Sequence, residues 1–140
     1  MQLVIDEWLK MKDINAQVTT YVEKKIPFYQ HWGRKELKAM VKFFSDLCQL
    51  IVHQDKKGKI DGVLALQFVD KPEDIHSWTN DFNAKGVAIV ILASENKEIR
   101  KELVRTAISI SGVRSWVCFE GAKYNQRMRV LPWALAERMA

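Results

Sequence analysis

The residues best placed for ligand chemistry follow a strongly apolar run. Residues 86–93, GVAIVILA, are predicted to form a strand buried on both faces, and the polar sequence SENK follows at once. Ser94 is a typical N-cap residue, so we expect a helix to begin at Glu95. Amides at a helix start bind phosphate groups, and Lys97 and Arg100 supply positive charge. Two glutamates in the same turn oppose an anion, so an ordinary acid-capped helix is an equal interpretation.

Other common sites find little support in the sequence. There is no GxxxxGK[ST] or GxGxxG motif, and no serine lies in a GxSxG turn. His31, His53 and His76 have no His or Cys partner at ligand spacing, which argues against a structural metal. Cys48 and Cys118 lie in apolar runs far apart, so we expect two reduced core thiols. Metal and nucleophilic chemistry are therefore not predicted.

The bulk composition indicates a compact protein of the cytoplasm. The 140 residues suit one domain, with residues 1–47 as a helical cover and residues 48–140 as a sheet with a crossover helix. No apolar run reaches the roughly 20 residues of a membrane span, and no signal peptide is recognisable. The net charge is +5, but the basic residues are spread along the chain, which favours a solvated surface over nucleic-acid binding.

The first half of the chain shows helical and then hairpin patterns. Apolar residues recur at helical spacing over residues 3–25 and 34–47, and Pro27 separates the two helices. The stripe predicted to be buried on the second helix comprises Leu37, Met40, Val41, Phe44 and Leu47. The aromatic connector between the helices is expected to close the core. Residues 48–69 predict an antiparallel hairpin around the turn QDKKGK.

The second half predicts a strand, helix and strand unit. A long loop over residues 70–85 precedes the buried strand, and the helix at 95–111 ends at Gly112. Its expected apolar stripe is Ile99, Leu103, Ala107 and Ile110. Residues 113–119 return as a strand parallel to the first. Residues 127–133 read as a final edge strand, and residues 134–140 as a short helix, which completes an α+β fold with a mixed sheet.

This order of elements resembles the GCN5-related N-acetyltransferase (GNAT) superfamily, whose members move an acetyl group from acetyl-CoA to an amine. The resemblance covers residues 48–133: a hairpin ending in KGKIDGVLAL, the buried strand with its crossover helix, and a strand leading to a break that contains a tyrosine. In particular, the chain looks like the short GNAT-like proteins encoded by phages and prophages. The resemblance implies a cytoplasmic or virion-associated protein.

The resemblance also implies site residues. The pantetheine of acetyl-CoA would lie against the strand backbone of Val90, Ile91, Leu92 and Ala93. The pyrophosphate would lie on the loop that holds Asn96, Lys97 and Arg100. By the same resemblance, Tyr124 would protonate the leaving thiolate. Glu120, at a strand end, would act as the general base for a small-molecule or protein amine.

Two alternatives stay open at this stage. The loop ENKEIR lacks the glycines of the family's pyrophosphate loop, which motivates a noncatalytic GNAT fold. Such a protein would serve in a phage particle, bind a host protein or form a homo-oligomer. Nucleic-acid binding, motivated by the positive charge alone, is the third hypothesis.

Overall fold

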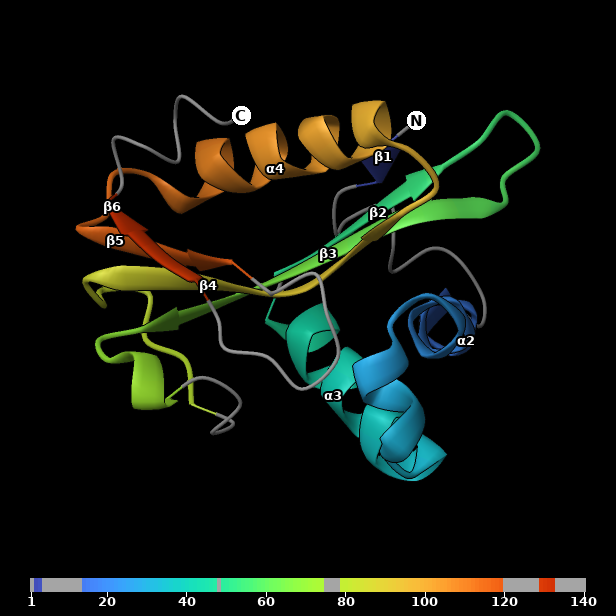
Figure 1. Ribbon diagram of the computed structural model, residues 1–140, viewed down its shortest axis with the longest axis horizontal. Helices are drawn as coiled ribbons and strands as arrows, with labels where there is room; N and C mark the ends of the chain where they lie inside the picture. Colours follow the sequence, from blue (N-terminus) through green and yellow to red (C-terminus); the bar gives the residue numbers. More distant parts are fainter. Residues whose placement is uncertain (1, 4–13, 48, 75–78, 120–128, 133–140) are drawn as a thin grey trace.

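A six-stranded mixed sheet forms the centre of the molecule in the computed structural model (Figure 1). The structure describes residues 2–3, 14–47, 49–74, 79–119 and 129–132. The strands lie in chain order: β1 (Gln2–Leu3), β2 (Leu50–Gln54), β3 (Ile60–Val69), β4 (Gly86–Ser94), β5 (Trp116–Phe119) and β6 (Arg129–Pro132). Within this described sheet the β4–β5 pair alone is parallel. The predicted α+β fold is confirmed.

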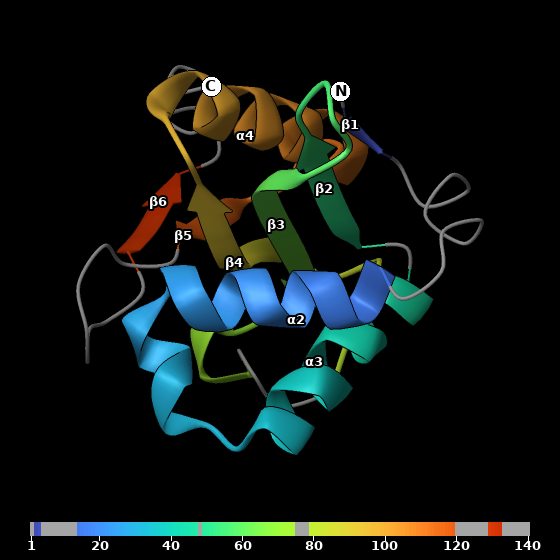
Figure 2. The same cartoon turned by 90° about the vertical axis from the view of Figure 1, so that its right-hand side faces the viewer.

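Helices cover both faces of the sheet (Figures 1 and 2). α2 (Ile14–Lys25) and α3 (Arg34–Asp46) lie on one face, and α4 (Lys97–Ser111) lies on the other. Two buried clusters result. One joins α2 and α3 to the sheet, and the other joins α4 to it. The strands of the sheet centre are therefore apolar on both faces, as their sequences predict.

The α2–α3 layer follows the predicted stripes with one exception. Val18 and Val22 of α2 are fully buried, as is the α3 stripe up to Phe44. Leu47, however, is 37% exposed. It lies just after the last turn of α3, so helical spacing no longer directs it to the core. The 3-10 helix η1 (Pro27–His31) connects the two helices and buries Tyr29, in agreement with the predicted closing role of this segment.

The start of the chain differs from the predicted helix. Gln2 and Leu3 form the edge strand β1, which pairs with His53 and Val52 of β2. A two-residue strand is too short to show a periodic pattern. It forms because its backbone pairs with the edge of β2, whose backbone groups would otherwise be unpaired. Residues 4–13 lie outside the described residues, so the helix prediction is confirmed for Ile14–Lys25.

The β2–β3 hairpin is confirmed. Gly58 takes a positive φ of 81°, which the turn requires and which glycine adopts without strain. Asp55 Oδ1 accepts hydrogen bonds from the amides of Lys57 and Lys59, both at 2.9 Å. The Lys59 bond contributes most to lowering the pKa of Asp55. Asp55 therefore has a structural role in the turn, where the sequence suggested none.

The strand, helix and strand unit is also confirmed, with corrections at its ends. β4 and β5 are parallel, joined by α4, and Gly112 closes the helix with a φ of 69°. α4 begins at Lys97 with Asn96 as N-cap, so the prediction of Ser94 as the cap was wrong. Ile110 is 40% exposed because Leu103, Val104 and Ala107 form the buried face instead.

The returning strand β5 is shorter than predicted. β5 begins at Trp116, because Val113 is 85% exposed and belongs to the connection after α4. β6 pairs antiparallel with β5, as expected for the final strand. The predicted helix at 134–140 lies outside the described residues.

Two further predictions from the sequence concern the cysteines and membrane-spanning segments. Cys118 is a free, fully buried thiol, and burial raises its pKa to about 11. Cys48 lies outside the described residues. Among the helices that the structure describes, none is long and apolar enough to cross a membrane.

Candidate functional site

A β-bulge interrupts β4 at Val90. Ile89 pairs with Leu66 and Ile91 pairs with Ala65, so Val90 is an extra residue opposite β3. The hydroxyl of Tyr29, from η1, donates a hydrogen bond of 3.0 Å to the carbonyl oxygen of Val90. Both groups are buried, and this bond fixes the helical layer to the bulge.

β4 continues beyond the described part of its ladder with β5. The last parallel pair is Ile89 with Phe119, whereas β4 ends at Ser94. The segment from Val90 to Ala93, which carries the predicted pantetheine contacts, therefore lies beyond the described end of the β4–β5 ladder. It leads directly to the start of α4 (Figure 1).

The start of α4 is built around Asn96. Its Oδ1 accepts a hydrogen bond of 2.9 Å from the amide of Ile99, and Ser94 Oγ donates to the carbonyl of Asn96. The amides of the first helical turn have no intrahelical acceptor, and Asn96 takes one of them. Lys97 and Arg100 are exposed here, and neither forms an ion pair with a described residue. Asn96 thus positions the helix, while the two cations face solvent.

Glu95 is tied to α2. Its carboxylate accepts from the Lys25 ammonium at 2.7 Å, and this bond contributes most to lowering the pKa of Glu95. The adjacent Tyr21 is buried, and burial followed by the charge of Glu95 raises its pKa. Its hydroxyl has no hydrogen-bond partner of regular geometry among the described residues. Of the two glutamates expected to oppose a phosphate, Glu95 is therefore compensated by Lys25, whereas Glu98 forms no ion pair with a described residue.

The structure places most of the predicted site residues at one end of the sheet. Val90, Ile91, Leu92 and Ala93 belong to β4, and Asn96, Lys97 and Arg100 lie at the start of α4. Tyr124 and Glu120 lie outside the described residues, and their roles stay predictions. Sequence reasoning missed Tyr29 and Lys25. No motif marks them, because each acts through a partner more than sixty residues away.

A second polar cluster lies on the α4 face. His53 Nδ1 is 2.5 Å from Asp61 Oδ1, and His53 Nε2 is 3.2 Å from Glu102 Oε2. The cluster joins β2, β3 and α4 where Gly62 allows close approach, since an added Cβ there would lie 2.6 Å from Ile99 Cγ2. The sequence pattern predicted no partner for His53, because its partners are carboxylates that other elements supply. No group of His, Cys, Asp and Glu in the described residues is arranged to hold a metal ion.

Comparison with known proteins identifies the fold. No family model matches the sequence, and no curated protein does. The structure superimposes on a GphF GNAT-like decarboxylase in complex with isobutyryl-CoA, with a TM-score of 0.57 and 16% identity. It also superimposes on the loading GNATL domain of CurA from Lyngbya majuscula, with a TM-score of 0.61 and 10% identity. The chain has a GNAT-like fold.

The GNAT-like match extends over most of this chain. The two superpositions cover 75% and 85% of it, but 60% and 63% of the respective neighbours. The chain therefore spans less than two thirds of either neighbour. The GNAT-like fold expected from the order of elements is confirmed, and the phage or prophage origin stays a prediction.

Proposed function

We propose that the chain binds acetyl-CoA and transfers its acetyl group to an amine. The observation that carries this proposal is the geometry of β4, which bulges at Val90, extends beyond the described part of its ladder with β5 and leads into the amides of α4. Strand backbone beyond a ladder offers amide hydrogen bonds, and a helix start offers amides to phosphate. The GNAT-like neighbour that contains isobutyryl-CoA supports the same class of ligand.

The residues at the start of α4 fit a pyrophosphate. Lys97 and Arg100 supply two exposed cations, and Lys25 compensates the nearby Glu95. Asn96 uses its side-chain oxygen to hold the Ile99 amide, so we assign it to positioning the helix rather than to direct phosphate contact. This arrangement takes the place of a glycine-rich loop, since the first-turn amides and two side chains remain available to an anion.

The proposed reaction is direct transfer. Acetyl-CoA supplies an activated acetyl thioester. Glu120 takes a proton from the acceptor ammonium, and the neutral amine then forms a bond to the thioester carbonyl carbon. The carbon–sulfur bond breaks, and Tyr124 gives its proton to the departing thiolate. The nitrogen loses its second proton as the amide forms, and this proton returns the Tyr124 phenolate to the neutral phenol. Positioning of the two reactants would provide much of the rate, and no covalent enzyme intermediate is needed.

Calorimetric titration with acetyl-CoA tests the cofactor proposal. We expect Lys97→Gln and Arg100→Gln each to weaken binding about tenfold, because each removes one charge-assisted contact to phosphate. Lys101→Gln is the matched control, since this exposed lysine lies on the same helix beyond the first turn and loses the same charge. Equal effects of all three variants, or no binding at millimolar acetyl-CoA, would contradict the proposal.

Turnover assays test the catalytic residues separately. With an amine acceptor found by screening, Tyr124→Phe is expected to lower kcat while leaving acetyl-CoA affinity unchanged. Glu120→Gln is expected to lower kcat most at low pH, where the acceptor is protonated. Unchanged kcat in either variant would remove that residue from the mechanism.

A noncatalytic binding module is the second candidate. Phe82 is 61% exposed and Val113 is 85% exposed, and Arg114 stacks on the Phe82 ring from the position next to Val113. Exposed apolar side chains of this kind suit a second copy of the chain or another protein. Light scattering that finds a stable oligomer, together with no acetyl-CoA binding, would favour this candidate.

A further inference from the structure

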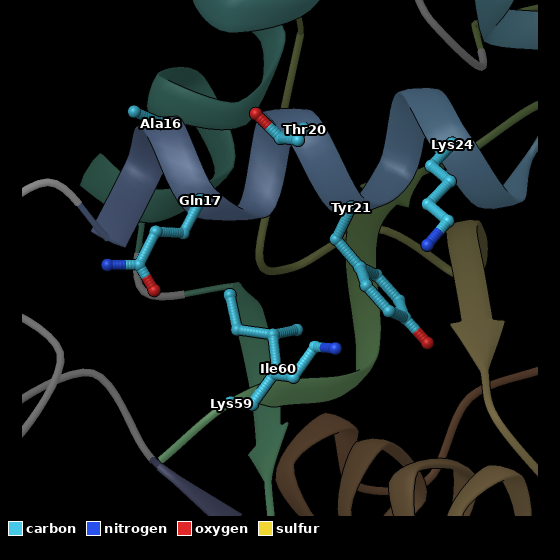
Figure 3. Close-up of a pocket in the computed structure, with 7 residues that line it drawn as sticks. All are labelled: Ala16, Gln17, Thr20, Tyr21, Lys24, Lys59 and Ile60. Atoms are coloured by element: carbon cyan, nitrogen blue, oxygen red, sulfur yellow. The ribbon is translucent and has the colours of Figure 1, made fainter. Parts of the chain in front are cut away.

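A cavity lies between α2 and the start of β3, away from α4. Its volume is about 400 Å³, within the range of small-molecule sites. Of the residues that the structure describes, seven line it (Figure 3): Ala16, Gln17, Thr20, Tyr21, Lys24, Lys59 and Ile60. Five come from α2, and two come from the end of the β2–β3 turn and the start of β3. No residue of β4 or α4 lines it, so it is separate from the proposed cofactor site.

The cavity combines apolar walls with positive charge. Ile60 and Tyr21 are buried core residues, and they form walls together with Ala16. In Figure 3 the side chains of Lys24 and Lys59 both extend towards the Tyr21 ring from opposite sides of the cavity. Two ammonium groups therefore accompany an apolar surface.

Neither ammonium is neutralised by an ion pair within the described residues. In the same layer, Lys25 contacts Glu95 and Arg34 contacts Glu23. The nearby carboxylate of Asp55 is held by backbone amides of the hairpin turn. The charge of Lys24 and Lys59 is thus available to a ligand.

We propose that this cavity binds a small organic anion in which a carboxylate or sulfonate is attached to an apolar body. Lys24 and Lys59 bind the anionic group, and the body packs on Ile60 and the Tyr21 ring. The same charges repel an ammonium, so the cavity does not suit the amine of the proposed reaction. The site is independent of the proposed function, because it uses none of the acetyl-CoA residues.

Titration with anilinonaphthalene sulfonate, an aromatic sulfonate whose fluorescence rises in apolar surroundings, tests the site. We expect saturable binding of one dye per chain. Lys24→Gln and Lys59→Gln should each weaken it about tenfold, because each removes one charged contact. Lys24→Arg and Lys59→Arg should retain it. Lys56→Gln and Lys57→Gln, at the exposed hairpin tip, are matched controls and should bind the dye as the parent chain does.

Competition separates this site from nonspecific binding and from the cofactor site. Octanoate should displace the dye, whereas octanol of equal chain length should not. Unsaturable dye binding, equal losses in the control variants, or equal displacement by octanol would overturn the proposal. Displacement by acetyl-CoA would also overturn it, since the cavity would then belong to the cofactor. Absence of acetyl-CoA binding in calorimetry would leave the dye result unaffected, so the two proposals fail separately.

Discussion

Tyr29 and Tyr21 both belong to the helical layer, but their hydroxyl groups differ in their hydrogen bonds. The Tyr29 hydroxyl donates to the Val90 carbonyl and so satisfies the extra residue of the β4 bulge. The Tyr21 hydroxyl is equally enclosed and has no regular hydrogen-bond partner among the described residues. Losing the Tyr29 hydroxyl should therefore cost more stability than losing the Tyr21 hydroxyl.

Tyr29→Phe is expected to lower the free energy of unfolding by about 1–3 kcal/mol, because the buried Val90 carbonyl loses its donor. Tyr21→Phe is the matched control. It removes a buried hydroxyl that faces Glu95 without a hydrogen bond of regular geometry, and it should destabilise the chain less than Tyr29→Phe does. Urea unfolding of both variants measures the difference. Equal destabilisation would mean that the Tyr29 hydrogen bond contributes nothing specific.

At the residue scale, the sequence correctly placed those residues whose location follows from neighbouring patterns along the chain. Lys97 and Arg100 could be placed at a helix start because strand and helix patterns adjoin there. The contact of Tyr29 with Val90 could not be predicted, because it spans 61 positions and depends on one extra residue in β4. The partners of His53 were missed for a similar reason, since three separate elements supply the cluster.

At the scale of the element, α4 depends on one side chain for its start. Asn96 holds the Ile99 amide, whereas Ser94 donates to a carbonyl and caps no amide. Both residues are good N-caps by type, so only the backbone position separates them. Asn96 has the extended backbone of an N-cap, with φ −154° and ψ 173°.

Asn96→Ala should lower the free energy of unfolding by about 1 kcal/mol, the usual effect of removing a helix cap. Ser94→Ala should have a smaller effect, because its exposed hydroxyl bond is replaced by water. Thermal unfolding compares the variants at one pH. A larger loss in Ser94→Ala would show that the helix starts earlier than Lys97. If acetyl-CoA is bound as proposed, Asn96→Ala should also weaken it.

Element prediction was strongest where periodicity runs long. The hairpin and β4 were predicted from β-rich apolar runs, and α3 and α4 were predicted from helical spacing. The ends of their buried stripes were predicted less well, because the apolar pattern continues to Leu47 and Ile110, which the core does not bury. β1 was not found, since its two residues are fixed by backbone pairing with β2 rather than by their own pattern.

Across the whole molecule, the ion pair of Lys25 and Glu95 joins α2 to the connection between β4 and α4. The two residues are 70 positions apart in the chain. The pair therefore links the helical layer on one face to the end of the sheet where α4 begins. Because it is partly exposed, its contribution to stability should be modest and reduced by salt.

The pH dependence of stability should report this link. The pKa of Glu95 is lowered in the folded chain, so the stabilisation is present above its ordinary value of 4.5 and is lost as pH falls through the folded value. Urea midpoints should therefore decline below about pH 4.5, and the decline should be shallower in Glu95→Gln. Glu98→Gln removes the same charge from the first turn of α4. If Glu95→Gln and Glu98→Gln give the same pH profile, the ion pair of Glu95 makes no specific contribution to the pH dependence of stability.

The chain-order arrangement of the strands has a consequence for the order in which the molecule folds. The antiparallel pair of β2 and β3 is joined by a short turn, which forms early because little chain entropy is lost. β4 then pairs with β3 after the longer connection of residues 70–85. The parallel seam between β4 and β5 must wait until the chain has passed through all of α4. Folding should thus proceed from the central hairpin outward, with the β5–β6 pair joining last. The seam that forms last also adjoins the part of β4, from Val90 onward, that we assign to the proposed cofactor site.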